Sequence, residues 1–318
     1  MQPPLRVVVL LNAAAGTLQA QGGTALADAV AAAFRLHRIT AILETLHGPE
    51  LDTAAKRAAQ QAHNREIDAV VVGGGDGSIR TVAQALAGSE VPLGILPLGT
   101  LNHFARDLGI PTAVDDAVAL IAAGATRHID VGEVNGEIFV NNSSLGLYPY
   151  LVLERERWRR HTGLARWSAM ILAGLGALQR LRMRRFSIRT EGVVEPYRSS
   201  GVFIGNNEYS LETGAFGRRA RLDGGRLCIY VGSAQGRVAL IRLAFRAALG
   251  LIDAGRDLRA MKVSRAEILL QKDRLLVALD GEIRVLQPPL QYRSRPGALR
   301  VFGPSSGDDS GFDRHGLA

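Results

Sequence analysis

The apolar positions in the first third of the chain fall into short runs, each followed by a longer, often Ala-rich stretch. The short runs have the length and branching of buried strands, and the longer stretches have a spacing compatible with helices. The predicted strands are Arg6–Leu11, Ile39–Glu44, Ala69–Val72 and Leu93–Leu96, and the predicted helices are Gly23–His37, Asp52–Asn64 and Ile79–Leu86. This alternation predicts an α/β domain in which helices flank a parallel sheet.

After residue 128 the pattern changes to short strands separated by turn residues. Examples are Ile138–Val140, Val202–Ile204, Leu227–Val231, Glu267–Leu270 and Leu275–Leu279. They predict a β-rich, β-sandwich-like second domain, with helices inserted near residues 163–182 and 235–250. From Gly303 onward Gly, Ser, Asp and Pro dominate, which is typical of disorder. We therefore predict one domain over residues 1–128, a second over 129–302 and a disordered tail over 303–318.

Length and cysteine usage agree with a two-domain protein of a reducing compartment. The chain has 318 residues, and single cores rarely grow beyond roughly 250–300 residues. Its apolar stretches are shorter than the roughly 18–20 residues of a membrane span, and the amino-terminal region lacks a convincing signal peptide. The single cysteine, Cys228, excludes an internal disulfide framework and a zinc cluster of cysteines. We expect a cytoplasmic protein.

The net charge of +8 comes mostly from arginine, and the arginines are unevenly spread. They gather on both sides of the apolar segment Trp167–Leu178, within residues 155–185. Such a stretch suits either a membrane-surface element or a core helix with solvated ends, and the sequence leaves both open. Nucleic acid is disfavoured, because aromatic residues make up only 5% of the chain and there is no recognition-helix or base-stacking motif.

The strand Ala69–Val72 runs into Gly73-Gly74-Gly75-Asp76-Gly77-Ser78, which we call the glycine turn. Glycine permits backbone angles and close approaches that a Cβ forbids. A strand, a glycine turn and a helix start together form an anion site, because unpaired N–H groups meet the helix dipole there. The turn lacks the Gly-Lys-Ser/Thr ending of a P-loop and the spacing of a dinucleotide-binding loop. We interpret it as a phosphate-binding turn of another kind.

Three predicted strands end in polar or glycine-rich loops, at residues 12–16, 73–78 and 97–102. Ligands of parallel sheets bind at the carboxyl ends of the strands. The three loops are therefore expected to converge on one ligand.

The motif at residues 74–78, followed by Pro97-Leu98-Gly99-Thr100-Leu101-Asn102-His103-Phe104-Ala105, resembles the diacylglycerol kinase catalytic domain. That family includes bacterial lipid kinases and sphingosine kinases, and it is related to NAD kinases and phosphofructokinases. Residues 12–16 lie where the family has an Asn-Pro-x-Ser-Gly loop, and Thr45 lies where it has a threonine. Three further motifs follow in family order: Gly205-Asn206-Asn207, Arg221–Leu227 and Asp280-Gly281-Glu282. The match spans residues 5–302 and implies an NAD-kinase/phosphofructokinase-like α/β domain with a β-rich partner that completes the active site.

The resemblance implies ATP- and Mg²⁺-dependent phosphorylation of a lipid hydroxyl, most simply that of diacylglycerol to give phosphatidic acid. It implies Asp280 and Asp76 as catalytic residues, and Asp76 and Glu282 as metal ligands. The nucleotide-binding residues that it implies are Asn12, Gly16, Thr45, Gly73, Gly74, Gly75, Gly77, Ser78, Thr100 and Asn102. The substrate would be taken peripherally from a membrane surface, and a homodimer is left open.

Asp280 is the residue for which the two lines of reasoning differ. Asp-Gly directly after the apolar strand Leu275–Leu279 is, on residues alone, more typical of a hairpin turn. By resemblance, Asp280 is instead the general base that takes the proton from the lipid hydroxyl, for which it needs only hydrogen-bond reach.

A few positions depart from the family pattern. Arg80 and Thr81 stand where Asn-Glu is common, and His103, which replaces a frequent Asp, is expected to be solvated or structurally bonded. Gly224 and Cys228 replace acidic residues, so we expect a structural metal site near Asp223 to be weak or absent. Asp130 matches a family aspartate, and both a turn role and a site role remain open for it.

Two alternatives belong to other classes of protein. A soluble NAD-kinase-like enzyme would use the same glycine turn, and Asn207-Glu208 superficially resembles that family's Asn-Glu pair. The loop at residues 99–102 favours the lipid branch. A non-catalytic nucleotide- or lipid-binding homologue is disfavoured because Asp76 and Asp280 are both retained.

Overall fold

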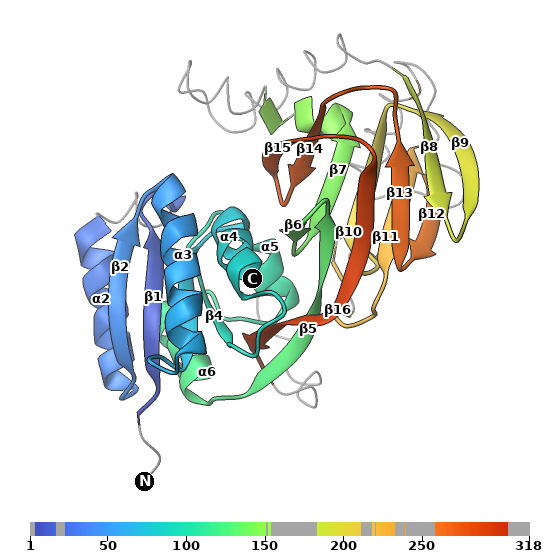
Figure 1. Cartoon of the computed structure of the whole chain (residues 1–318). Coiled ribbons are helices and arrows are strands. Elements are labelled where there is room, and N and C mark those ends of the chain that lie inside the picture. The colour runs from blue at the N-terminus through green and yellow to red at the C-terminus, as the bar shows by residue number, and fades with distance from the viewer. Residues whose placement is uncertain are drawn as a thin grey trace, which may run out of the picture. The chain divides into compact units, whose positions relative to one another are not determined.

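The computed structural model (Figure 1) describes residues 4–16, 23–150, 152–153, 183–210, 218–219, 221–232, 239 and 258–304. The chain divides into two compact units. Unit 1 comprises Met1–Ile129 and Gly297–Ala318, and unit 2 comprises Asp130–Pro296. The predicted helices near 163–182 and 235–250, the apolar segment Trp167–Leu178 and all but the first residues of the predicted tail lie outside the described residues.

Unit 1 is built on a parallel sheet with the strand order β2-β1-β3-β4. These strands are β1 (Arg6–Asn12), β2 (Thr40–Leu46), β3 (Ala69–Gly74) and β4 (Leu93–Pro97). Val70, Val71 and Val72 of β3 are fully buried, as expected of a strand covered on both faces. The α/β architecture expected from the sequence is confirmed.

Helices cover this sheet in two pairs. They are α2 (Gly23–Leu36), α3 (Gly48–His63), α4 (Asp76–Leu86) and α6 (Val114–Ala122). Helix α2 packs beside α6, and α3 packs beside α4. Right-handed crossovers explain why α2 is separated from α3 and α4. The connection through α2 runs from β1 to β2 in one direction across the sheet, whereas the connections through α3 and α4 run in the opposite direction and therefore cover the other face. Helix α4 begins at Asp76, within the glycine turn, rather than at the predicted Ile79.

Unit 2 contains two packed antiparallel arrays of strands, which confirms the expected β-sandwich. One has the order β12-β11-β10-β7-β14-β15, and the other β16-β13-β8-β9. The strands of unit 2 are β5 (Thr126–Val134, which starts in unit 1), β6 (Glu137–Phe139), β7 (Asn142–Gly146), β8 (Arg184–Thr190), β9 (Val193–Ser199), β10 (Gly201–Asn206), β11 (Leu227–Gly232), β12 (Leu258–Val263), β13 (Arg265–Leu269), β14 (Leu275–Leu279), β15 (Glu282–Leu286) and β16 (Leu290–Phe302). Buried side chains such as Phe139, Ile204, Ile229, Val277 and Tyr292 form the core between the arrays.

Strand β16 contributes to both units. Its first residues, from Leu290 to Arg293, pair antiparallel with β13 in unit 2. Near its end, Val301 pairs in parallel with Leu93 of β4, and Leu299 and Val301 are fully buried. The predicted second domain extended to residue 302, whereas the structure assigns the chain from Gly297 onward to unit 1. The reason is that the apolar end of β16 extends the parallel sheet beside β4.

Candidate functional site

The glycine turn of unit 1 packs tightly against the loop that follows β4. A Cβ on Gly99 would lie 2.4 Å from the Cα of Gly75, so the two backbones touch where these glycines meet. A Cβ on Gly74 would lie 2.5 Å from the Ser78 hydroxyl oxygen. Glycine is therefore required at both residues, since a side chain at 99 would push the two loops apart and one at 74 would collide with Ser78 within the turn.

The loop after β1 joins the same cluster. The Asn12 side-chain amide donates to the Ser78 hydroxyl at 2.7 Å, and Asn12 Oδ1 accepts from the Ala14 backbone N–H at 2.9 Å. A Cβ on Gly16 would lie 3.3 Å from Thr100 Oγ1, which places these two loops side by side. The structure thus brings together the three loops that the sequence predicted to converge.

Asp76 bridges two helix starts. It is the first residue of α4, and its carboxylate accepts from the backbone N–H groups of His103 (3.2 Å) and Phe104 (2.9 Å). These two N–H groups begin the short helix α5 (His103–Asp107). A carboxylate at this position satisfies N–H groups that have no partner within their own helix. Asp76 therefore fixes the glycine turn to α5, and its metal-binding role stays a prediction.

Asn102 shapes the loop before α5. Its backbone is left-handed, with φ of 48°, a conformation that Asn tolerates better than most residues. Its side-chain amide donates to the carbonyls of Pro97 (3.0 Å) and Gly99 (2.9 Å). Thr100 and His103 are exposed beside it, and Thr45 is exposed near the carboxyl end of β2. Nucleotide contacts of Asn102, Thr100 and Thr45 stay predictions.

In unit 2, Asp280 and Gly281 form the two-residue turn of a hairpin. Their φ angles are 48° and 83°, and Leu279 pairs with Glu282 across the turn. Two successive positive φ angles are typical of a type I′ turn, for which Asp-Gly is a preferred sequence. The hairpin that the residues alone favoured is therefore found. It leaves open whether the same residue is also a catalytic base.

The Asp280 carboxylate lies in a nest of backbone N–H groups. It accepts from Val140 (2.8 Å), Asn141 (2.7 Å) and Asn142 (3.0 Å). The Asp280 N–H in turn donates to the Asn142 carbonyl at 2.9 Å. Bonds from N–H groups to an ionised carboxylate are charge-assisted and short, so the position of the carboxylate is closely determined.

A buried arginine supports this nest from behind. The Arg219 guanidinium, whose residue is only 5% exposed, donates to the Val140 carbonyl (2.7 Å), the Asn206 carbonyl (3.1 Å) and Asn141 Oδ1 (2.7 Å). It also lies over the Tyr209 ring, 5.6 Å from the centroid. Two of the residues whose N–H groups bind Asp280 are thus fixed on their other side by Arg219.

The remaining second-half motifs converge on the same region of unit 2. The Asn206 amide donates to the carbonyls of Asp130 (2.8 Å) and Val140 (3.0 Å). Asp130 accepts from the Gly225 N–H at 2.6 Å, and Asn207 accepts from the Gly224 N–H at 3.0 Å. In this structure, then, Asp130 is a turn partner.

Glu282, a predicted metal ligand, and Asp223, where a metal site is expected to be weak or absent, both have cationic neighbours. Glu282 pairs with Arg284 at 3.2 Å, and Asp223 pairs with Arg221 at 3.0 Å. Within the described ranges no group of three or more His, Cys, Asp or Glu side chains could hold a metal ion. The metal role of Glu282 stays a prediction.

Sequence reasoning missed Arg219 and the segment 140–142. A usable signal was present for the segment, because Asn141-Asn142-Ser143-Ser144 is a polar run directly after an apolar one. Arg219 had no comparable signal, since its carbonyl partner on Val140 is 79 residues away in the chain.

Cys228, the single cysteine, is buried close to the Tyr230 hydroxyl. Burial raises the pKa of the Cys228 thiol and that of the Tyr230 hydroxyl. Burial likewise raises the pKa of Tyr292, which bonds Ser143. These groups are therefore neutral at physiological pH, and a raised pKa makes Cys228 an unreactive thiol.

Comparison with known proteins agrees with this arrangement. The model of the diacylglycerol kinase catalytic domain matches residues 6–134, and that of the YegS C-terminal NAD kinase beta sandwich-like domain matches residues 154–303. A probable lipid kinase YegS-like from Pseudomonas aeruginosa is 32% identical over 267 residues, which cover 80% of this chain and 82% of the relative. The chain belongs to the YegS-like lipid kinase family.

Two diacylglycerol kinases, one of them putative, are also similar to this member of the YegS-like lipid kinase family. A diacylglycerol kinase from Bacillus subtilis is 43% identical over 90 residues, covering 27% of this chain and 30% of that protein. The crystal structure of a putative diacylglycerol kinase from Bacillus anthracis has a TM-score of 0.69 and 25% identity, and covers 96% of this chain and 97% of that one. The predicted family is confirmed. In the part of this family member that the structure describes, no helix has both the length and the apolar character to cross a bilayer.

Proposed function

We propose that the chain is an ATP-dependent kinase that transfers the γ-phosphate of ATP to the hydroxyl of diacylglycerol, giving phosphatidic acid. The observation that carries the proposal is the convergence of three loops on the start of α4 in a member of a lipid kinase family. The similarity to the diacylglycerol kinase of Bacillus subtilis supports diacylglycerol as the acceptor.

The residues of unit 1 fit the phosphates of a nucleotide. The N-cap of α4 is Gly75, which has no side chain to accept from the first N–H groups of the helix. A phosphate oxygen can take that place, and the helix dipole favours the negative charge. Thr100 and Asn12 supply polar groups from the two adjoining loops.

We also propose Mg²⁺ as the metal ion of the reaction. Protein sites for Mg²⁺ with bound nucleotides commonly use one or two carboxylates, with substrate phosphates and water as the other ligands. Asp76 supplies one carboxylate at the glycine turn, and Glu282 is the second proposed ligand. When bound, the ion would neutralise charge on the transferred phosphoryl group.

Unit 2 supplies the proposed base. The hydroxyl proton of the acceptor passes to the Asp280 carboxylate as the hydroxyl oxygen bonds to the γ-phosphorus and the bond to ADP breaks. Because three N–H groups fix the carboxylate, it needs no reorganisation to accept the hydrogen bond. We further propose that the acceptor is taken from a membrane surface, with the protein bound peripherally.

Incubation of the purified protein with labelled ATP, Mg²⁺ and separate acceptors tests the proposal. The panel is diacylglycerol, a sphingoid base, undecaprenol and NAD. We expect label in phosphatidic acid. Transfer to NAD and to none of the lipids contradicts the lipid kinase proposal, and preferential transfer to another lipid contradicts diacylglycerol as the acceptor.

A further inference from the structure

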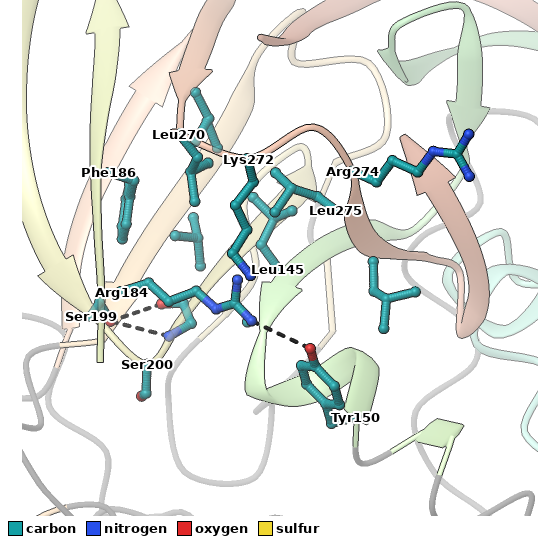
Figure 2. Close-up of a pocket in the computed structure, with 15 residues that line it drawn as sticks. Leu145, Tyr150, Arg184, Phe186, Ser199, Ser200, Leu270, Lys272, Arg274 and Leu275 are labelled. Carbon is teal, nitrogen blue, oxygen red and sulfur yellow. Dashed lines mark hydrogen bonds between the residues drawn. The ribbon is translucent and has the colours of Figure 1, made fainter. Parts of the chain in front are cut away.

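One end of the unit 2 sandwich contains an apolar cavity that the proposed phosphoryl transfer does not use. Its volume is about 90 Å³, and Figure 2 shows the residues around it. The floor is made by core side chains of both arrays: Leu145, Phe186, Val202, Ile268 and Leu275. The cavity therefore offers an apolar surface close to the solvent.

The mouth of this cavity is cationic. Arg184, Lys272 and Arg274 line it, and none of the described residues that line it is acidic. In Figure 2 the Arg184 and Lys272 side chains approach the cavity, whereas Arg274 points away from both. Arg184 donates to the Tyr150 hydroxyl at 3.3 Å, and among the described residues no carboxylate pairs with Arg184 or Lys272.

Two other polar groups of the mouth are engaged by the protein itself. The Ser199 hydroxyl bonds the carbonyls of Gly201 (3.0 Å) and Gly232 (2.9 Å), and the Ser200 carbonyl accepts from Leu147 at 2.9 Å. The mouth thus presents two cations, with the Ser200 hydroxyl beside them, above an apolar floor. Their chemistry matches a molecule with a negative head and an apolar tail.

We propose that this cavity binds an anionic lipid, with its head group between Arg184 and Lys272 and the start of its tail on the apolar floor. A neutral acceptor such as diacylglycerol would leave both cations unmatched. Charge-assisted bonds at the edge of an apolar cavity are stronger than bonds in open water, so two cations suffice to select an anionic head.

The cavity is separate from the proposed base. It lies at the Leu275 end of β14, and Asp280 follows the other end at Leu279. A strand rises about 3.3 Å per residue, so these ends are about 13 Å apart. Between them Val277 and Leu279 are fully buried in the packed core. The anionic lipid would therefore hold the enzyme at a bilayer surface without occupying the place of the acceptor hydroxyl.

Calorimetric titration of the full chain with monomeric dioctanoylphosphatidic acid tests this proposal. The variant carrying Arg184→Gln and Lys272→Gln should bind it at least about tenfold more weakly, because two charge-assisted contacts are lost. A matched control carrying Arg38→Gln and Arg265→Gln removes the same charge from exposed sites that do not line the cavity, and should stay within about twofold of the original. Leu270→Trp, which fills the cavity and keeps the charges, should also weaken binding.

Three results would overturn the proposal. They are unchanged binding in the double variant, inorganic phosphate binding as tightly as the lipid, and an equal loss of binding for neutral dioctanoylglycerol. The first result would show that the two cations do not bind the lipid. The second would show that the site binds any anion, and the third that it is the acceptor site. Transfer of label to dioctanoylglycerol is measured separately in the same variants, so failure of the kinase proposal is distinguished from failure of this one.

Discussion

Each unit of the protein fixes one key carboxylate with consecutive backbone N–H groups, but the supports behind them differ. In unit 1, Asp76 accepts from His103 and Phe104 at the start of α5. In unit 2, Asp280 accepts from Val140 and Asn141 in a loop and from Asn142 at the start of β7. A helix start orients its N–H groups by itself, whereas a loop needs something else to do so.

That difference explains two unlike sets of supporting residues. In unit 1 the backbones of Gly75 and Gly99 touch, so the turn is fixed by the absence of side chains. In unit 2 a large buried cation, Arg219, ties the loop through its carbonyl groups and the Asn141 side chain. The carboxylate site of unit 1 thus depends on glycines that have no side chain, whereas that of unit 2 depends on a buried charged side chain.

Asp280→Asn should have the largest effect on transfer. The amide cannot accept the proton, and general base catalysis contributes about 10²–10⁴-fold, so kcat for lipid phosphorylation should fall by that order. Single-turnover transfer from labelled ATP measures it. Asp273→Asn removes an exposed carboxylate just before β14 and is the control. Transfer at a near wild-type rate in Asp280→Asn would show that the base is another group.

Arg219→Met should weaken the unit 2 site through the loop. It leaves three buried acceptors without the guanidinium, so the free energy of unfolding should fall by at least about 2 kcal/mol. Displacement of the loop should lower kcat by up to about 10²-fold, with KM for ATP little changed. Arg219→Lys should recover part of both losses. If KM for ATP rises while kcat is kept, Arg219 does not act through Asp280.

Gly99→Ala and Gly75→Ala form a matched pair for the unit 1 site. The Cβ at residue 99 would meet Gly75 Cα at 2.4 Å, whereas the Cβ at 75 would meet Gly99 Cα at an ordinary 3.4 Å. Overpacking costs about 1–3 kcal/mol, so Gly99→Ala should lower the thermal midpoint clearly more than Gly75→Ala. Equal midpoints would mean that the loops yield easily and that the contact does not fix the turn.

The smallest expected effects concern the pH dependence of stability, which we expect at acid pH in unit 1 and at alkaline pH in unit 2. In unit 1 the hydrogen bond from Arg6 lowers the pKa of Asp68. This contribution to stability is present above the pKa of Asp68 in the unfolded chain, about 3.9. It is lost as pH falls through the lower pKa of the folded protein. In unit 2, burial and then the bond to Glu195 raise the pKa of Tyr197 to about 12. That contribution is present below about 10 and is lost as pH rises through the folded value.

Urea unfolding across pH checks both. Asp68→Asn should flatten the acid limb alone and Tyr197→Phe the alkaline limb alone, each slightly because both groups are partly exposed. Asp52→Asn, which removes another exposed ion pair of unit 1, is the control. An unchanged acid limb in Asp68→Asn would show that this pair adds nothing measurable.

The parallel sheet was largely predictable, because its strands are long apolar runs with a clear period. The prediction was less accurate at the glycine turn, where β3 continues through Gly74 and α4 starts at Asp76. Glycine lacks strand or helix propensity, yet Gly73 and Gly74 pair with Leu96 and Pro97. Tertiary pairing therefore overrides the local signal at this point.

In unit 2, strand β7 and Arg219 escaped prediction for a different reason. The sequence of β7, Asn-Ser-Ser-Leu-Gly, reads as a loop, but Ser143 and Ser144 are buried between neighbouring strands. Ser143 is bonded to the Tyr292 hydroxyl at 2.9 Å, a partner 149 residues away. Two partners of Arg219, on Val140 and Asn141, are 79 and 78 residues away. A polar residue whose partners come from remote segments cannot be distinguished locally from one that is solvated.

The path of β16 has a consequence for how the protein is made. Unit 1 contains the first stretch of the chain together with residues from Gly297 onward, and Val301 completes the edge beside β4. During synthesis the first part of unit 1 therefore leaves the ribosome early but lacks its last strand until the whole of unit 2 has been translated. A fragment that stops at Ile129 would expose the edge of β4, so the amino-terminal half should be studied with residues 297–304 linked back to it.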